Sequence, residues 1–110
     1  QDQRYRDYSK GVDFIQRYIF PGGFLPSVTA MSTLMTRHTD FVIRNLIDMG
    51  PDYARTLVHW RQRFVHAWQD IEKLGFDDRF RRMWLYYLSY CEAGFNARTI
   101  SVVQLTAERV

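Results

Sequence analysis

Residues 50–75 read GPDYARTLVHWRQRFVHAWQDIEKLG, and this stretch decides the fold of the 110-residue chain. Its large apolar side chains recur every three or four residues, which places them in one stripe along a helix. They are Tyr53, Leu57, Trp60, Phe64, Trp68 and Ile71. The opposite face carries polar side chains, namely Arg55, His59, Gln62, His66, Gln69 and Lys73. Pro51 suits the first helical turn, where its missing N–H has no partner to lose. We therefore predict one amphipathic helix from Pro51 to a stop near Gly75.

A second helix is predicted to follow this one. Asp77 or Asp78 provides the side-chain oxygen that caps a helix start. Its apolar stripe again follows steps of three and four, through Phe80, Met83, Trp84, Tyr87, Leu88, Cys91 and Phe95. The two stripes can face each other in a helical hairpin.

One strand is predicted before these helices and one after them. Residues 41–49, FVIRNLIDM, are rich in β-branched and aromatic side chains, and Gly50 and Pro51 end the run. Residues 99–106, TISVVQLT, have the same character. Two strands form no stable sheet by themselves, so they are expected to join a larger one.

The first forty residues are expected to be less regular. Residues 1–8, QDQRYRDY, are polar and predict an irregular segment. Val12–Phe20 predicts a short helix that ends before Pro21, because a residue before proline is displaced from helical geometry. Ser27–Arg37 predicts a second short helix that starts after Pro26.

Composition limits the chain to one domain at most, which we interpret as a single fragment of a longer protein. Hydrophobic residues make up 46% and aromatic residues 16%, a heavy apolar load for a core this small. The chain begins with Gln1 and carries no signal peptide, and no apolar run approaches the ~20 residues of a membrane span. The net charge of +3 is spread along the chain, and a lone cysteine excludes an internal disulfide framework.

Several common site chemistries are not encoded locally. His59 and His66 stand seven residues apart on one helix, about 10.5 Å along its axis, so they cannot share a metal ion. No glycine-rich phosphate loop follows a strand, and Ser89, His66 and Asp70 lack any spacing typical of a nucleophilic triad. The helical spacing of the aromatic residues favours core packing over base stacking.

The loop at residues 18–27, YIFPGGFLPS, is unusually apolar. Exposing Ile19, Phe20, Phe24 and Leu25 together would create an adhesive surface patch. The loop therefore predicts a partner surface or a pocket wall.

Four segments of the sequence carry a family resemblance. They are FIQRYIFPGGFLPS at 14–27, GPDYARTL at 50–57 with Trp60 and Phe64 after it, YLSYCEAGF at 87–95 and VQL at 103–105. In order and spacing they resemble the C-terminal part of cyclopropane-fatty-acyl-phospholipid synthases and the related mycolic acid cyclopropane synthases. The resemblance implies an α/β fold: the C-terminal portion of a Rossmann-like methyltransferase, mostly helical, whose two strands pair antiparallel at the sheet edge.

The resemblance also implies a reaction. Such enzymes transfer a methyl group from S-adenosylmethionine to a cis double bond of a lipid acyl chain, and loss of a proton to bicarbonate closes a cyclopropane ring. This chemistry needs a dry apolar tunnel and aromatic faces that stabilise a transient cation. Phospholipid acyl chains at the membrane surface are the implied partner, with a cytoplasmic location peripheral to the inner membrane.

Roles for individual residues follow from the same resemblance. Tyr53 matches a tyrosine that contacts bicarbonate, and Phe20 matches an aromatic residue that faces the cationic centre. Acyl-chain contacts are implied for Leu25, Leu57, Tyr87, Cys91 and Phe95. Each of these five also fits an ordinary core position. Cys91 is expected to be a small buried hydrophobe and Glu92, which lies off the apolar stripe, a solvated surface residue.

Other parts of such an enzyme are expected upstream of Gln1. They include the glycine-rich S-adenosylmethionine loop and a cysteine, a glutamate and a histidine that contact bicarbonate. We therefore expect the fragment by itself to be inactive, to bind no cofactor or metal, and to need the missing N-terminal half. Its apolar faces predict self-association into a homo-oligomer. Two alternatives stay open, a non-catalytic lipid-binding or protein-interaction module and, with less support, a helical regulator that binds nucleic acid.

Overall fold

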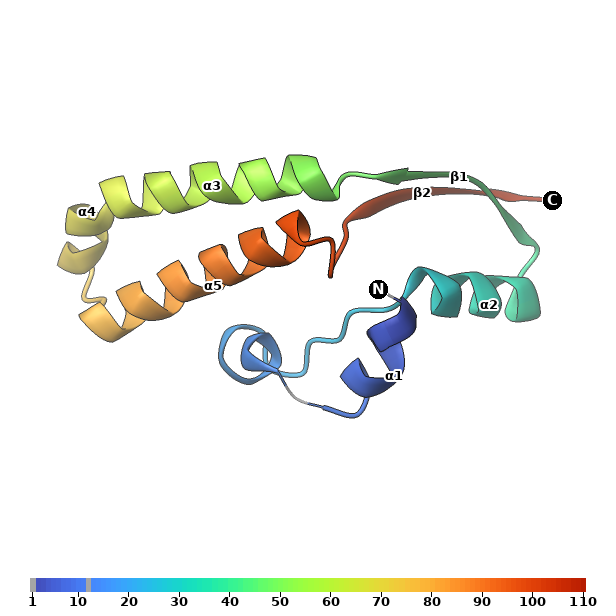
Figure 1. The fold of residues 1–110 in the computed structure, drawn as a ribbon, viewed down its shortest axis with the longest axis horizontal. Coiled ribbons are helices and arrows are strands. Elements are labelled where there is room, and N and C mark those ends of the chain that lie inside the picture. The colour runs from blue at the N-terminus through green and yellow to red at the C-terminus, as the bar shows by residue number, and fades with distance from the viewer. Residues whose placement is uncertain (1, 12) are drawn as a thin grey trace. The chain divides into compact units, whose positions relative to one another are not determined.

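The computed structural model describes residues 2–11 and 13–110. The chain divides into two compact units, which are described separately. The first comprises the residues up to Asp48 together with Val103–Val110, and the second is Met49–Val102. Figure 1 shows the order of the elements, with a helical hairpin in the second unit and a two-stranded ribbon in the first.

Short helices open the first unit. Residues Asp2–Arg4 form a 3₁₀ turn (η1) and Tyr5–Tyr8 a helical turn (α1), so the prediction of an irregular start was wrong. The next helix is a π-helical segment, η2, at Ile15–Ile19. Its start is fixed by Asp13 and Gln16, whose side chains each accept the other's backbone N–H at 2.8 and 2.9 Å, as in a capping box. It is shorter than the predicted Val12–Phe20, and Val12 lies outside the described residues.

Helix α2 spans Val28–His38 and confirms the helix predicted after Pro26. The Ser27 hydroxyl caps its start by accepting the Ala30 N–H at 3.0 Å. At its end, the Thr39 N–H donates to the Met35 carbonyl at 3.0 Å, and the chain then enters the first strand.

The ribbon pairs β1, Phe41–Asp48, with β2, Val103–Arg109. The pairing is antiparallel and runs from Phe41 opposite Arg109 to Asp48 opposite Val103, which confirms the predicted orientation. A register shift at Arg44 interrupts it, and the Arg44 guanidinium pairs with Glu108 at 2.7 Å.

Strand β2 begins four residues later than predicted, because the residues before it terminate a helix instead. The backbone N–H groups of Thr99 and Ile100 both donate to the Gly94 carbonyl, at 3.0 and 3.4 Å. Glycine at position 94 allows the chain to pass this close, because a Cβ there would lie 2.9 Å from Ile100 Cδ1. The β-branched character of Thr99 and Ile100 was therefore overridden by helix-end hydrogen bonds.

The second unit is a helical hairpin. Helix α3 spans Gly50–His66, α4 spans Trp68–Lys73 and α5 spans Asp78–Asn96. Both predicted stripes meet inside it, and its buried hydrophobic side chains are Ala54, Leu57, Trp68, Leu88, Cys91 and Phe95. The Asp77 carboxylate caps α5 by accepting the Phe80 N–H at 2.9 Å, as predicted.

The predicted single helix from Pro51 to Gly75 is in fact broken at Ala67. Neither glycine nor proline marks this position. The break accompanies the burial of Trp68, whose ring lies 5.8 Å from Phe64 and under the Arg81 guanidinium at 5.5 Å. The polar face predicted for this stretch is exposed, from Arg55 to Lys73.

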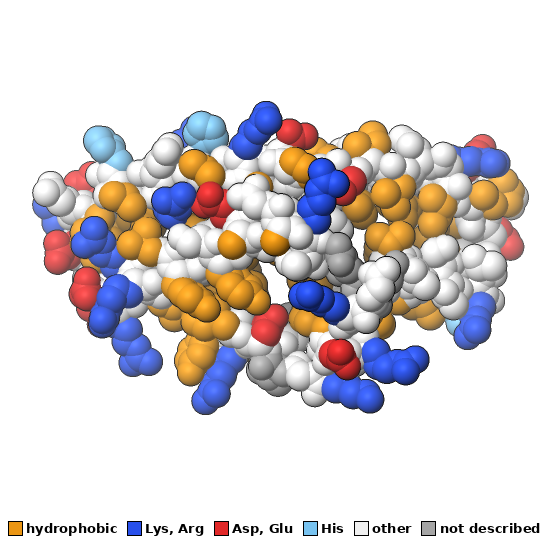
Figure 2. All heavy atoms as spheres, viewed as in Figure 1, with side chains coloured by type: hydrophobic (Ala, Val, Ile, Leu, Met, Phe, Trp, Pro, Cys, Tyr) orange, Lys and Arg blue, Asp and Glu red, His pale blue; other side chains and the backbone are white. Residues whose placement is uncertain are grey.

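Among the described residues, no helix is both long enough and apolar enough to cross a membrane. Figure 2 shows hydrophobic side chains at many points of the visible surface. Large hydrophobic side chains are exposed in both units, including Phe41 and Ile47 on the ribbon and Trp60 and Leu74 on the hairpin. The predicted apolar excess is thus a surface property of this chain.

Candidate functional site

The hairpin brings five of the seven predicted site residues into one unit. Leu57, Cys91 and Phe95 are buried, with Leu57 only 1% exposed, and Tyr53 and Tyr87 are partly buried. The Tyr53 ring meets the Phe95 ring edge-on, with centroids 4.9 Å apart. The structure therefore joins the start of α3 to the end of α5 through aromatic side chains.

Trp60 belongs to this cluster, although no site role was predicted for it. Its ring meets the Tyr53 ring edge-on, with centroids 5.8 Å apart, from a position seven residues further along the same face of α3. These two edge-to-face contacts restrain the Tyr53 ring. The sequence signal that could have identified Trp60 was its place in the apolar stripe, which follows from the spacing of three and four residues.

Tyr87 lies where an uncharged phenol is strongly favoured. Burial, and then negative charge on Cys91 and Tyr53, raises the pKa of Tyr87 to about 12, and a hydrogen bond with Cys91 acts in the same direction. The Tyr87 phenol therefore stays protonated at neutral pH. The interior around Tyr87 and Cys91 accordingly disfavours negative charge.

Phe20 and Leu25 lie in the other unit. Both are exposed, Phe20 at 53% and Leu25 at 60%, so among the described residues neither side chain is enclosed. Hydrogen bonds still shape it: the Leu25 N–H donates to the Tyr8 hydroxyl at 3.0 Å, and the Gln16 amide donates to the Gly23 carbonyl at 3.0 Å. Gly22 has a positive φ of 79°, which glycine adopts without strain.

Neither implied small-molecule group finds a complete site in these residues. For bicarbonate, Tyr53 offers one phenol donor, but its backbone N–H already donates to the Met49 carbonyl at 2.9 Å and Pro51 has no N–H. The start of α3 is thus a poorer anion cradle than a free helix end. For S-adenosylmethionine, the described residues hold no glycine-rich turn between a strand and a helix.

Metal binding finds no support in the described part of the chain. No group of three or more His, Cys, Asp or Glu side chains gathers there in a way that could hold an ion.

Glu92 is not the solvated residue that was predicted. Its carboxylate accepts a hydrogen bond from Arg61 Nη2 at 3.0 Å, and its side chain is only 21% exposed. The pair joins α5 to α3 one residue from Cys91. Sequence reasoning missed it because the partner lies on the other helix, 31 residues away.

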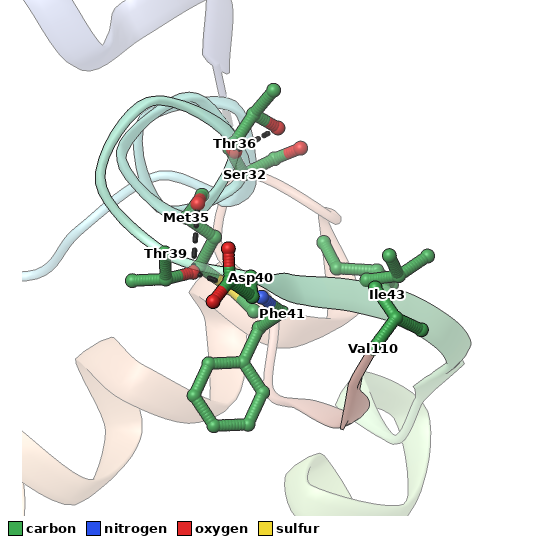
Figure 3. Close-up of a pocket in the computed structure, with 9 residues that line it drawn as sticks. Ser32, Met35, Thr36, Thr39, Asp40, Phe41, Ile43 and Val110 are labelled. Atoms are coloured by element: carbon green, nitrogen blue, oxygen red, sulfur yellow. Dashed lines mark hydrogen bonds between the residues drawn. The ribbon is translucent and has the colours of Figure 1, made fainter.

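An open hollow among the described residues lies elsewhere, between α2 and the ribbon (Figure 3). It encloses about 340 Å³ and is lined by Met35, Thr36, Thr39, Asp40, Phe41 and their neighbours. None of the predicted site residues lines it. We give more weight to the aromatic cluster than to this open hollow, because only the cluster combines burial with a perturbed titratable group.

Comparison with known proteins defines the class of this fold. The model of the family described as mycolic acid cyclopropane synthetase matches residues 1–105. The chain belongs to this family. Its fold is therefore a mostly helical portion of the α/β methyltransferase fold, which confirms the fold class expected from the motifs.

Three relatives make the likeness more specific. The chain is 45% identical over 96 residues to tuberculostearic acid methyltransferase UfaA1 of Mycobacterium tuberculosis, covering 87% of this chain and 22% of the relative. It is 40% identical over 96 residues to cyclopropane-fatty-acyl-phospholipid synthase of Escherichia coli, covering 87% of this chain and 24% of that protein. A cyclopropane-fatty-acyl-phospholipid synthase of Citrobacter freundii is 38% identical over 69 residues, which cover 63% of this chain and 76% of that sequence. The chain spans less than a quarter of the first two relatives.

Proposed function

We propose that this chain is part of an S-adenosylmethionine-dependent methyltransferase that adds a methylene across a cis double bond of a phospholipid acyl chain. The hairpin supplies one wall of the acyl-chain site. The observation that carries this proposal is the aromatic cluster of Tyr53, Tyr87 and Phe95 around buried Cys91, in a chain of this family. The names of the relatives support both the methyl transfer and the lipid substrate.

The residues of the hairpin would exclude water and orient the substrate. Leu57, Cys91 and Phe95 are buried and apolar, as an acyl chain requires. The Tyr53 ring is held by Phe95 and Trp60, so its phenol would have a fixed position for contact with an anion. In the complete protein, Phe20 and Leu25 would also contact the substrate, and the exposed aromatic face of Phe20 suits a transient cation.

S-adenosylmethionine supplies the transferred carbon when it is bound, and residues outside this chain would hold it. The same holds for most of the bicarbonate contacts. We propose that the chain without them is inactive, that the complete protein acts on lipids at the inner membrane surface from the cytoplasm, and that it self-associates. Exposed apolar side chains on both units support a role in such contacts.

The experiment is methyl transfer by the natural full-length protein. Isotope-labelled S-adenosylmethionine is mixed with vesicles of a phospholipid that bears one cis double bond, and the acyl chains are analysed by mass spectrometry and NMR. We expect each product chain to gain one methylene and to show cyclopropane proton signals. A methyl-branched product would contradict the proposed ring closure. It would favour methyl transfer alone, as in the name of the Mycobacterium tuberculosis relative.

The same assay separates the alternatives. A full-length protein that binds the vesicles but transfers no label, under conditions in which it binds S-adenosylmethionine, would be a lipid-binding module. Steeply salt-dependent binding to an oligonucleotide, with none to lipid, would instead indicate a nucleic-acid regulator.

A further inference from the structure

The turn at the tip of the helical hairpin, Leu74 to Phe76, is apolar and exposed. We propose that it inserts into a phospholipid bilayer and that the outer face of α5 lies along the bilayer surface. This inference rests on the proposed lipid substrate and adds the surface through which the protein reaches it. The tip is the end of the second unit opposite its base, where the Met49 N–H donates to the Val102 carbonyl at 2.8 Å.

The tip holds apolar side chains out in water. Leu74 is 76% exposed, more than any other large hydrophobic side chain among the described residues, and Phe76 is 42% exposed. Gly75 between them has a φ of 99°, which turns the chain sharply. The Phe76 ring stacks on Phe80 with centroids 4.4 Å apart, so it is already fixed before any partner binds. A bilayer interior would remove this apolar surface from water.

Basic side chains follow the tip along α5. Arg79 and Arg82 are exposed in the first turns of α5, and from Arg79 to Cys91 the sequence holds three arginines and no acidic residue. Figure 2 shows Lys and Arg side chains, with Asp and Glu side chains among them, at the left end, where Figure 1 places α4 and the start of α5. Basic side chains beside apolar ones are typical of segments that bind anionic lipid surfaces.

Four carboxylates near the tip, Asp70, Glu72, Asp77 and Asp78, equal in number the cations Lys73, Arg79, Arg81 and Arg82, so the surplus of positive charge begins only beyond Asp78, along α5. Asp78 pairs with Arg82 at 3.1 Å, and Asp70 pairs with Lys73 at 3.7 Å. Both pairs are exposed and therefore weak, so their cations can turn to lipid phosphates. Asp77 is occupied as the cap of α5.

Two tyrosines continue the surface along α5. Tyr86 and Tyr90 are exposed, and their rings stack with centroids 5.9 Å apart. Arg79, Arg82, Tyr86 and Tyr90 follow steps of three and four and therefore share one helix face. Tyrosine, with an apolar ring and a polar hydroxyl, is favoured at membrane–water interfaces. The apolar tip, the exposed arginines of α5 and the tyrosine face together match the layers of an anionic bilayer.

The test uses the full-length protein and vesicles of phosphatidylcholine, with or without phosphatidylglycerol. We expect tighter binding to the anionic vesicles. The double variant Leu74→Ser with Phe76→Ser should bind them at least about tenfold more weakly, because two inserted apolar side chains are lost. The matched control is Leu34→Ser, an exposed leucine on α2, which should bind like the natural protein. Leu74→Ser alone should leave thermal unfolding unchanged because Leu74 is 76% exposed, whereas loss of the Phe76 stack on Phe80 should lower the melting temperature of the double variant slightly.

A direct probe of insertion is an environment-sensitive fluorophore on Leu74→Cys. Its emission should shift to the blue on addition of anionic vesicles, whereas the same probe on Arg55→Cys, on the polar face of α3, should not shift. Native Cys91 is buried, and any other cysteine of the full-length protein is first replaced by serine, so that labelling at position 74 is selective. Absence of a shift at position 74 with bound vesicles would overturn the inference.

Two further outcomes are informative. If the double variant changes the sedimentation coefficient and leaves vesicle binding intact, the tip binds a second copy and the bilayer inference is wrong. If the natural protein transfers no methyl group but inserts position 74 into vesicles, the proposed reaction fails and the membrane surface stands.

Discussion

Replacement of Tyr53 by phenylalanine separates a catalytic role from a packing role. The change removes the phenol and keeps the ring, so the edge contacts with Phe95 at 4.9 Å and Trp60 at 5.8 Å survive. We expect the free energy of unfolding to change by less than about 0.5 kcal/mol, as for a substitution without a cavity. If the phenol contacts charge that develops during the reaction, turnover should fall about 10²- to 10³-fold.

Tyr53→Ala is the matched comparison for stability. It removes both edge-to-face contacts, each worth about 0.5–1.5 kcal/mol, in addition to the burial of the ring. We therefore expect a loss of at least about 1–3 kcal/mol from this variant alone.

The assay measures label transfer from S-adenosylmethionine to vesicle phospholipid by the full-length protein, alongside urea unfolding. Loss of activity by Tyr53→Phe with unchanged stability supports the catalytic role. Full activity of Tyr53→Phe would refute it. Equal destabilisation by both variants would show that Tyr53 has only a packing role.

Three further predictions concern the hairpin. Leu57→Ala should cost about 2–5 kcal/mol of unfolding free energy in urea titrations, because the side chain is 1% exposed and leaves a cavity; a loss under about 1 kcal/mol would mean that the site collapses around it. Glu92→Gln should cost about 1 kcal/mol, and a double-mutant cycle with Arg61→Met should return a coupling energy that shrinks in high salt; zero coupling would contradict a structural role for the pair. The pKa of Tyr87 is raised from 10.0 to about 12, so its stabilising contribution is complete below pH 10 and is lost as the pH rises from 10 to 12. Ultraviolet titration should show a late phenolate step that Tyr87→Phe removes, and an unchanged titration curve would count against the buried assignment.

Periodicity predicted the hairpin well because apolar spacing directly encodes which helix face is buried. Tyr53, Leu57 and Trp68 all lie toward the second helix, as their positions in the stripe required. Local capping chemistry also predicted where helices begin, at Ser27 and Asp77.

Features that depend on distant partners were not predictable in the same way. The break at Ala67 follows from the packing of Trp68 against side chains on other turns, and no breaker residue marks it. The ion pair of Arg61 and Glu92 needs the hairpin to exist before the two charges meet. The late start of β2 reflects hydrogen bonds to the Gly94 carbonyl that strand propensity does not describe.

The candidate site was predictable only as far as the motifs reached. The motifs proposed Tyr53, Tyr87, Cys91 and Phe95 as site residues, and the fold places them in one hairpin. They included Trp60 but implied no site role for it, although its ring contacts the Tyr53 ring edge-on at 5.8 Å. The roles of these residues stay predictions until the variants are assayed.

The placement of the hairpin between paired strand ends has an evolutionary consequence. The chain leaves β1 after Asp48 and enters β2 at Val103, and these two residues are opposite each other in the ribbon. An excursion that starts and finishes at neighbouring points can change in length at little entropic cost. The hairpin can therefore be exchanged as a unit: grafting the corresponding segment of a relative between Asp48 and Val103 should retain the strand register.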